Sequence, residues 1–499
     1  MKIKGPIVLI ILDGFGFSNE TKYNAIFQAN TPNLSLWFTK YPSTILNASG
    51  EYVGLPKGYI GNSEVGHLTI GSGRRIKQIL TIINESIKEG SFFENKILND
   101  NLQKLHCVNG NLHVMGLLSD AGVHSHEKHF YAYIQAAVDN KISNIYLHVF
   151  LDGRDVPPRS AEIYLTRLQN YISKFKNVKI ASVQGRFYAM DRNKNEDRTK
   201  RSYEVLTEVQ NIKFKNWQEV IDYYYQQNIT DEFIPPTQLD SNAIVKKGDG
   251  IIFCNFRADR ARQLIELFVD DKSIDLTFFI TPVLLIKDAN NTISLFKENI
   301  IKNSLMDIFA QHKIETFSIA ETEKYAHVTY FFRAGRELPL ENETQVIVPS
   351  VNVKKYVEYP NMSAQEITNT VLESLKNDDI DFYLINYANA DMVGHSGDLQ
   401  ATIKAIEWLD LQLGKLFEEV VERRNGTIFI TADHGKAEIM FDSVTNQPNT
   451  AHTTSQVPFL FLRKDLAGQN IKLNLKELAD IAPFILQNLN INVPDEMKK

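Results

Sequence analysis

The sequence contains few cysteines and no excess of basic residues. Its 499 residues include only two cysteines, Cys107 and Cys254, too few for a disulfide framework or a thiolate metal cage. Such low cysteine usage fits a reducing compartment, so we expect a cytoplasmic protein. The 54 Lys and Arg residues against 60 Asp and Glu give a formal net charge of −6, so the chain as a whole has no field suited to a polyanion. We expect no nucleic-acid partner, and any anion site must be built locally.

Long apolar runs are also missing. Near the N-terminus two lysines precede an apolar stretch, as in an export signal, but the stretch covers only residues 7–12 before Asp13 ends it. We interpret it as a buried strand. A second apolar stretch, residues 278–286, is interrupted by Thr281 and Pro282 and falls short of the roughly 20 residues that a membrane-spanning helix needs. We therefore expect no membrane association.

The chain does contain enough apolar residues for large cores. With 43% apolar side chains and about 150 residues per domain, its length corresponds to two or three domains. Several short apolar runs are typical of strands buried on both faces, and helical patterns follow many of them, as at 160–174 and 398–422. This alternation predicts an α/β fold. No internal repeat, low-complexity segment or flexible linker marks a domain boundary.

The polar residues that follow the apolar runs fall into two chemical groups. Ligands of open parallel sheets bind beyond the carboxyl ends of the strands, so these residues are candidates for a site. The first and last parts of the chain contribute carboxylates and imidazoles, namely Asp13, Asp391, Asp433 and His434. The middle contributes mostly arginines, in the set Arg154, Asp155, Arg186, Arg257 and Arg260. If each group converges on its own sheet, a domain of residues 77–310 is inserted into a domain formed by 1–76 and 311–499.

The carboxylates and imidazoles of the first group are typical of a metal site. Asp391 and His395 are four residues apart just past a strand, so a helical turn places both side chains on one face. With His452, three carboxylates and three imidazoles suit two borderline or hard divalent ions, and the lack of thiolates argues against a purely structural zinc site. Two ions about 4 Å apart can stabilise both oxygens of a phosphoryl transfer. Taken singly, each residue could equally be a capping aspartate or a core histidine.

A candidate nucleophile, Ser63, lies in GYIGNSEVGHLTIGSGR at the predicted start of a short helix. A metal can strip a serine hydroxyl there of its proton, while neighbouring backbone N–H groups receive an oxyanion or phosphate. For this residue alone, a plain helix N-cap is the alternative.

The second group predicts an anion site. Residues 184–201 carry six Lys or Arg against three Asp or Glu. The guanidinium groups of Arg186 and Arg192 each offer a planar fork that matches a carboxylate or phosphate. Arg257 and Arg260 are three residues apart and would share a helical face.

Ten motifs span essentially the whole chain in a fixed order: LDGFG, GNSEVGHLTIGSGR, HSH, LDGRD, GRFYAMDR, NFRADRAR, EKYAHVTYFF, NYANADMVGH, TADHG and AHT. With these motifs the chain resembles cofactor-independent phosphoglycerate mutase. The resemblance implies a metal domain of the alkaline-phosphatase superfamily with a second α/β domain inserted into it. It implies interconversion of 3- and 2-phosphoglycerate through a phosphoserine at Ser63, without 2,3-bisphosphoglycerate. It also implies two Mn²⁺ ions, with other divalent ions as alternatives, one held by Asp13, Ser63, Asp433 and His434 and the other by Asp391, His395 and His452.

The same resemblance implies how phosphoglycerate is bound. The matching residues are His124, Arg154, Asp155, Arg186, Arg192, Arg257, Arg260 and Lys324. Asp155 is the candidate acid/base for the substrate hydroxyls, because it is the one carboxylate in this cationic group, with an ion pair to Arg154 as the alternative. The expected catalytic residues are therefore Ser63, Asp155 and Lys324. The expected partner is this small-molecule substrate alone, bound by a monomer.

The sequence departs from the family pattern at a few positions. Thr69 and Ser72 replace the usual Asn and Ala, and FFRAGRE replaces an FFNGG-like run, which adds Arg333 as an extra cation near Lys324. A phosphatase or phosphopentomutase of the same superfamily would share the metal pattern, but the arginine motifs favour an isomerised product over free phosphate. A silent anion-binding or metal-storage protein would lack at least one catalytic position, and none is missing.

Overall fold

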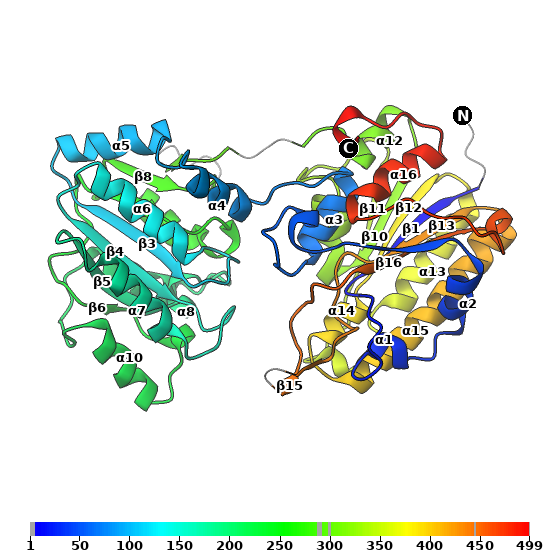
Figure 1. Cartoon of the computed structure of the whole chain (residues 1–499), viewed down its shortest axis with the longest axis horizontal. Helices are drawn as coiled ribbons and strands as arrows, with labels where there is room; N and C mark the ends of the chain where they lie inside the picture. The colour runs from blue at the N-terminus through cyan, green and yellow to red at the C-terminus, as the bar shows by residue number, and fades with distance from the viewer. Residues whose placement is uncertain (1–4, 287–291, 298–300, 444–445, 499) are drawn as a thin grey trace. The chain divides into compact units, whose positions relative to one another are not determined.

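The computed structural model describes residues 5–286, 292–297, 301–443 and 446–498. The chain divides into two compact units, unit 1 of residues 1–78 and 300–499 and unit 2 of residues 79–299, so one continuous segment interrupts unit 1 (Figure 1). The return to unit 1 precedes α12 (Leu305–Gln311), whose Met306 and Phe309 are buried in the core of unit 1. No helix among the described residues is long and apolar enough to cross a membrane.

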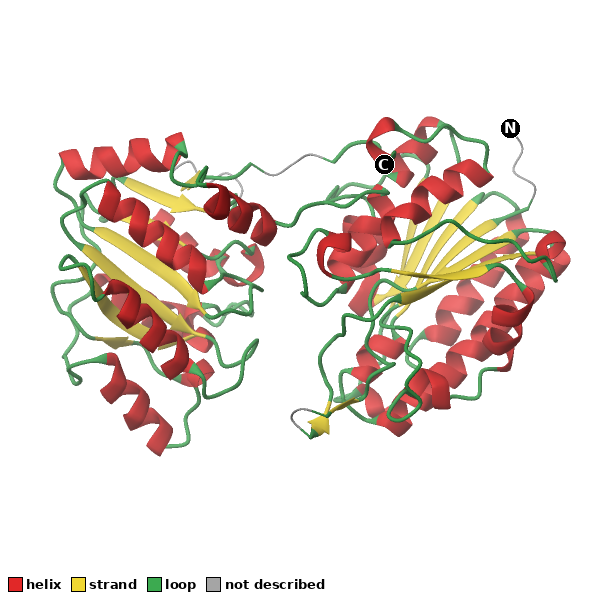
Figure 2. Cartoon of the chain, viewed as in Figure 1, coloured by secondary structure: helices red, strands yellow, loops and turns green. Residues whose placement is uncertain are grey.

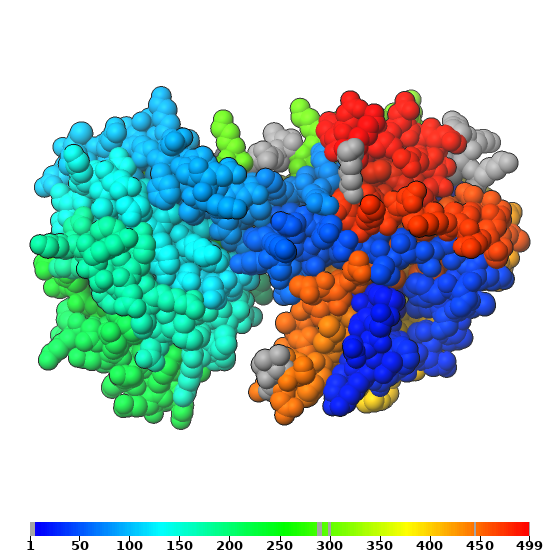
Figure 3. Space-filling model, viewed as in Figure 1, coloured from blue at the N-terminus to red at the C-terminus, as the bar shows by residue number. Residues whose placement is uncertain are grey.

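Unit 1 is built on a seven-stranded sheet of order β11-β10-β12-β1-β13-β16-β2. β1 (Ile7–Leu12) is central and parallel to both neighbours, β12 (Phe382–Tyr387) and β13 (Thr427–Thr431). β10 (Thr316–Glu321) and β11 (Glu343–Val348) continue the parallel part. β16 (Val457–Arg463) and β2 (Ser43–Leu46) form antiparallel pairs at the other edge. Early and late residues therefore share one surface of this unit, blue beside orange in Figure 3.

Helices cover both faces of the unit 1 sheet (Figure 2), which explains why β1 and β12 are buried along their whole length. The helices besides α12 are α1 (Ala25–Gln28), α2 (Pro32–Lys40), α3 (Ser63–Ser72), α13 (Ala364–Ser374), α14 (Asn389–Gly394), α15 (Leu399–Phe417) and α16 (Ile481–Asn488). A short hairpin of β14 (Phe441–Asp442) and β15 (Gln447–Pro448) precedes β16.

Unit 2 is built on a second seven-stranded sheet, of order β6-β5-β4-β3-β7-β8-β9, parallel except for β6. Its strands are β3 (Leu112–Leu118), β4 (Ile145–Leu151), β5 (Val178–Gly185), β6 (Thr237–Gln238), β7 (Gly250–Phe253), β8 (Phe278–Thr281) and β9 (Thr292–Ser294). Its helices are α4 (Ile79–Glu89), α5 (Lys96–Cys107), α6 (Glu127–Asp139), α7 (Ala161–Ile172), α8 (Arg186–Ala189), α9 (Glu196–Thr207), α10 (Trp217–Gln226) and α11 (Arg262–Asp270). The predicted α/β class is confirmed.

A row of hydrogen-bonding side chains crosses the core of unit 2. His113 Nε2 lies 3.2 Å from Asp249 Oδ2, His113 Nδ1 lies 2.9 Å from His148 Nε2, and His148 Nδ1 lies 2.8 Å from Ser182 Oγ. Both histidines are buried, and burial lowers the pKa of each. Burial therefore disfavours the protonated form of both imidazoles in the folded unit.

This row makes the stability of unit 2 sensitive to acid. As pH falls below about 6.5, the ordinary histidine pKa, the unfolded chain takes up protons that the folded core excludes, so the free energy of unfolding decreases. We expect hydrogen exchange, corrected for intrinsic rates, to show that β3 and β4 open more readily at pH 5.5 than at pH 7. In His148→Gln this pH dependence should be smaller, and in His106→Gln, which changes an exposed histidine, it should be that of the wild type. An unchanged dependence in His148→Gln would refute the explanation.

Candidate metal centre

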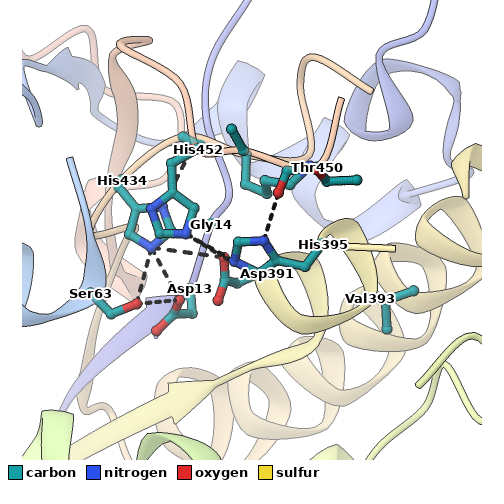
Figure 4. A network of polar contacts seen from close by, with 12 residues as sticks. Asp13, Gly14, Ser63, Asp391, Val393, His395, His434, Thr450 and His452 are labelled. Carbon is teal, nitrogen blue, oxygen red and sulfur yellow. Dashed lines mark hydrogen bonds and ion pairs between the residues drawn. The ribbon is translucent and has the colours of Figure 1, made fainter. Parts of the chain in front are cut away.

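The carboxyl ends of three neighbouring strands bring the predicted ligands of unit 1 together. Asp13 directly follows β1, Asp433 and His434 follow β13, and Asp391 lies on α14 just after β12. Because β12, β1 and β13 are parallel neighbours, these side chains meet at one edge of the sheet. Figure 4 shows three of the four there, Asp13, Asp391 and His434. All four are buried.

The ligand atoms form two overlapping sets. One atom each of Asp13, Asp433 and His434 lie within 4.8 Å of one another, and so do atoms of Asp391, His434 and His452. His395 joins the second set, since its Nε2 lies 3.1 Å from Asp391 Oδ1 and 3.0 Å from His452 Nε2. The structure thus brings together all six carboxylates and imidazoles that the sequence predicted.

The imidazole orientations fit a cation better than mutual hydrogen bonds. His395 Nδ1 lies 2.7 Å from the Thr450 carbonyl oxygen, and His452 Nδ1 lies 2.9 Å from the Gly61 carbonyl oxygen. A carbonyl oxygen only accepts, so in the neutral rings each Nδ1 carries the proton and each Nε2 presents its lone pair. Both Nε2 atoms face Asp391 Oδ1, at 3.1 and 3.2 Å. Lone pairs and a carboxylate oxygen that converge on one point are the donor set of a divalent metal.

Ser63 lies among the ligands of the first set. Its Oγ is 3.1 Å from Asp13 Oδ1 and 3.0 Å from His434 Nε2. The alternative role as a helix cap is wrong, because Asn62 caps α3 by accepting a hydrogen bond from the Val65 N–H at 3.1 Å. The serine hydroxyl is instead directed at the ligands.

Lys324 places a buried cation in the same site. Its Nζ donates to Asp13 Oδ1 at 2.6 Å, to Asp391 Oδ2 at 2.7 Å and to Ser63 Oγ at 2.7 Å. Burial alone would lower the pKa of Lys324, but the surrounding carboxylates, Asp13 first among them, outweigh it and raise the pKa. Lys324 in turn holds the pKa of Asp13 and Asp391 well below the usual range, against the opposite effect of burial.

His434 also responds to the carboxylates. Burial lowers its pKa, but Asp433, Asp13 and Asp391 together raise it to about 9. A metal ion that binds this imidazole must therefore displace a proton.

Two functional residues were missed by the sequence reasoning. His67 Nδ1 lies 2.8 Å from the Ser63 carbonyl oxygen, and its Nε2 lies 3.0 Å from Asn386 Nδ2, which also donates to Asp13 Oδ2 at 2.8 Å. Both side chains are fully buried behind the ligands and hold the backbone of Ser63 and the carboxylate of Asp13. The available signals were the four-residue spacing from Ser63 to His67 on one helix and a single polar residue in the run FYLINY.

Arg333, the extra cation where the sequence departs from the family pattern, is buried among partners of its own. Its Nε donates to the Thr329 carbonyl oxygen at 3.1 Å, and its Nη1 lies 3.5 Å from Glu343 Oε2. The Arg333 guanidinium thus binds backbone carbonyl groups around the end of the helical segment 327–331, with Glu343 as a charged neighbour.

The predicted anion group of unit 2 also gathers at adjacent strand ends. Its members follow β3 (His124), β4 (Arg154 and Asp155), β5 (Arg186 and, further on, Arg192) and β7 (Arg257 and Arg260). Burial first, and then four of these arginines, lower the pKa of His124 to about 2, so this imidazole is neutral in a cationic surrounding. Lys324, the remaining predicted substrate ligand, belongs to unit 1.

The role of Asp155 in this group differs from the sequence expectation in two ways. Its charged partner is Arg186, whose Nη1 lies 2.5 Å from Asp155 Oδ2 and 2.7 Å from Asp152 Oδ1, and the expected alternative partner Arg154 pairs instead with Glu232 at 3.3 Å. Asp155 is also not the one carboxylate present, because Asp152 and Asp259 face the same arginines.

Comparisons with known proteins agree with this site. The sequence pattern of the Metalloenzyme superfamily matches residues 5–493, so the chain is a metalloenzyme of that superfamily. The chain is 44% identical to a 2,3-bisphosphoglycerate-independent phosphoglycerate mutase of Clostridium kluyveri (99% of this chain, 98% of the relative) and 43% identical to that of Malacoplasma penetrans (99% and 98%). It belongs to the family of 2,3-bisphosphoglycerate-independent phosphoglycerate mutases.

A solved structure agrees with the sequence relatives. The crystal structure of Leishmania mexicana phosphoglycerate mutase at low cobalt concentration superposes with a TM-score of 0.79 at 28% identity, covering 99% of this chain and 97% of that one. The resemblance read from the motifs is confirmed, and with it the predicted fold class and the dependence on a divalent metal.

Gly66 on α3 offers a test of how tightly the metal centre is built. A Cβ atom at this position would lie 2.5 Å from the Asp433 carbonyl oxygen and 2.7 Å from Asp433 Cβ, so Gly66→Ala must displace Asp433. We expect Mn²⁺ affinity, measured by calorimetry, to fall about 10- to 100-fold, and thermal stability to fall by about 1–3 kcal/mol.

Gly414→Ala on α15 is the matched control, because the nearest atoms to its Cβ would belong to the side-chain amide of Asn33, at 2.9 Å, and not to a metal ligand. Equal Mn²⁺ affinity in the two variants would contradict this reading of the packing.

Proposed function

We propose that the chain interconverts 3-phosphoglycerate and 2-phosphoglycerate, with Ser63 as the residue that carries the phosphoryl group. The observation that carries this proposal is the position of Ser63 Oγ, 2.7 Å from Lys324 Nζ and 3.1 Å or less from Asp13 and His434. The names of the full-length relatives support it. No 2,3-bisphosphoglycerate is required, because the serine itself stores the phosphoryl group between the two half-reactions.

We propose two Mn²⁺ ions, with other divalent ions as alternatives. Asp13, Ser63, Asp433 and His434 would hold one, and Asp391, His395 and His452 the other. Bound there, the ions would favour the alkoxide of Ser63 and neutralise charge on the phosphoryl oxygens. The two overlapping ligand sets support this count.

The residues of unit 1 carry the first half-reaction. Ser63 Oγ loses its proton and attacks phosphorus, and the bond from phosphorus to the substrate oxygen breaks. That oxygen takes up one proton to become a hydroxyl of glycerate, so the net step transfers one phosphoryl group to Ser63 and one proton to glycerate. Lys324 is placed to fix Ser63 Oγ beforehand and to stabilise the negative charge that develops on the phosphoryl group. The N-terminus of α3, where Ser63 is the first residue, adds a positive end of the helix dipole.

In the second half-reaction the other hydroxyl of glycerate attacks the phosphoserine and regenerates Ser63. We assign glycerate to the cationic group of unit 2, with its carboxylate held by arginine forks. Asp155, paired with Arg186, is the proposed acceptor and donor of the protons on the glycerate hydroxyls. We further propose that the enzyme is a cytoplasmic monomer, in keeping with two unpaired cysteines.

Ser63→Ala tests the covalent step. Without the nucleophilic oxygen, formation of 2-phosphoglycerate should fall to the uncatalysed background, while the remaining carboxylates and imidazoles still bind at least one Mn²⁺ per chain by elemental analysis. Ser72→Ala, on the same helix, should keep wild-type activity. Mutase activity in Ser63→Ala above that of a Mn²⁺ blank would disprove the phosphoserine mechanism.

Arg257→Ala and Asp155→Asn test the assignment of glycerate. If these residues orient glycerate for the second transfer, water reaches the phosphoserine more often in the variants. The ratio of inorganic phosphate released to 2-phosphoglycerate formed should rise even as total turnover falls, and Arg159→Ala, which changes an exposed arginine of the same unit, should leave it unchanged. A proportional loss of both products would place Arg257 and Asp155 in substrate capture or the first transfer instead.

A further inference from the structure

Lys436 is a fully buried lysine that none of the steps above uses. It lies in the loop after β13, and its side chain has no exposed surface. Its Nζ donates to the Asn449 carbonyl oxygen at 3.1 Å and lies 3.9 Å from Met440 Sδ. Burying an ammonium group costs free energy unless its interactions compensate. The free-energy cost of burying Lys436 therefore suggests that this side chain has a structural or functional role.

The Lys436 side chain lies between two segments that carry metal ligands. One is α14: a Cβ atom at Gly394 would lie 3.1 Å from Lys436 Cγ and 3.6 Å from its Nζ, so the lysine stem runs along the end of this helix. The helix itself carries Asp391, and His395 directly follows it. The second segment is 449–452, which the ammonium contacts through the Asn449 carbonyl.

The segment 449–452 fixes two of the imidazoles. The Thr450 carbonyl oxygen lies 2.7 Å from His395 Nδ1, and His452 is itself a member of the segment. Asn449 is held to the loop of Lys436 by further hydrogen bonds, from its N–H to the Met440 carbonyl oxygen at 3.0 Å and from its Nδ2 to the Ile439 carbonyl oxygen at 2.9 Å. The bond from Lys436 Nζ engages the Asn449 carbonyl, next in the chain to the peptide of Thr450.

We propose that Lys436 is a positioning residue for the metal-ligand set Asp391, His395 and His452. By holding the Asn449 carbonyl and packing along α14, it fixes the distance between the helix and the 449–452 segment. This distance determines whether His395 Nε2 and His452 Nε2 converge beside Asp391 Oδ1. The inference rests on the proposed metal centre and extends it to a residue that contacts no substrate.

Electrostatics acts in the opposite direction. A positive charge close to Asp391 repels a divalent ion, and removing it should by itself strengthen metal binding. Positioning and charge therefore predict opposite changes in affinity, which makes the two roles separable.

The test measures Mn²⁺ binding by calorimetry and by electron paramagnetic resonance in the full chain. Lys436→Met keeps the length of the stem and removes the ammonium. We expect one of the two Mn²⁺ ions to bind about 10- to 100-fold more weakly, while the other changes by less than about threefold. In a cycle with His395→Ala, Lys436→Met should cause little further loss, because both changes act on the same ion. Lys404→Met, which changes an exposed lysine of α15, is the matched control and should bind both ions as the wild type does.

The outcomes separate this inference from the proposed function. A wild-type chain that binds fewer than two Mn²⁺ ions contradicts the two-ion centre itself. If the wild type binds two, then unchanged affinity, tighter binding, or equal weakening of both ions in Lys436→Met overturns the role of Lys436. If Lys436→Met does not fold, Lys436→Gln provides the same test. Its amide can still donate to the Asn449 carbonyl, so we expect a smaller loss of affinity at the same ion. The results that overturn the inference are the same as for Lys436→Met.

Discussion

The structure of unit 1 depends on three buried carboxylates held at one edge of a sheet. Asp13, Asp391 and Asp433 are each at most 2% exposed, and each unpaired charge of this kind costs several kcal/mol to bury. Lys324 balances part of the charge through two short contacts with Asp13 and Asp391. One ammonium and the raised pKa of His434 against three carboxylates still leave a net negative site, and the Nε2 lone pairs of His395 and His452 add donors rather than charge. A divalent cation satisfies both requirements at once.

The position of these carboxylates could be predicted because it follows from strand order alone. Asp13, Asp391 and Asp433 each follow an apolar run, and parallel strands end at the same edge, so the sequence was sufficient to group them. The same reasoning grouped Arg154, Arg186 and Arg257 in unit 2. This grouping needed only local sequence features, namely a buried strand, the position where it ends and the type of residue that follows.

Residues whose role comes from tertiary packing could not be found in this way. Lys436 reads in the sequence as an ordinary charge in a loop, and only its contacts with α14 and the Asn449 carbonyl distinguish it. The alternative role of Asp155, an ion pair with Arg154, is wrong for a related reason. Arg154 pairs with Glu232, whereas Arg186, from the end of the adjacent strand β5, reaches Asp155 across the sheet edge. Sequence proximity was a poor guide where strand adjacency decided the contact.

The two units share an α/β architecture but carry charge of opposite sign at their strand ends. In unit 1 the strand ends carry excess negative charge, which raises the pKa of His434 against the effect of burial. In unit 2 they carry excess positive charge, which lowers the pKa of His124 together with burial. A phosphorylated hydroxy acid presents two demands of its own: a phosphorus centre whose oxygens must be neutralised while a serine attacks, and a carboxylate that must be held in a fixed orientation. In the proposed mechanism a cation-binding centre would meet the first demand and a cluster of arginine forks the second.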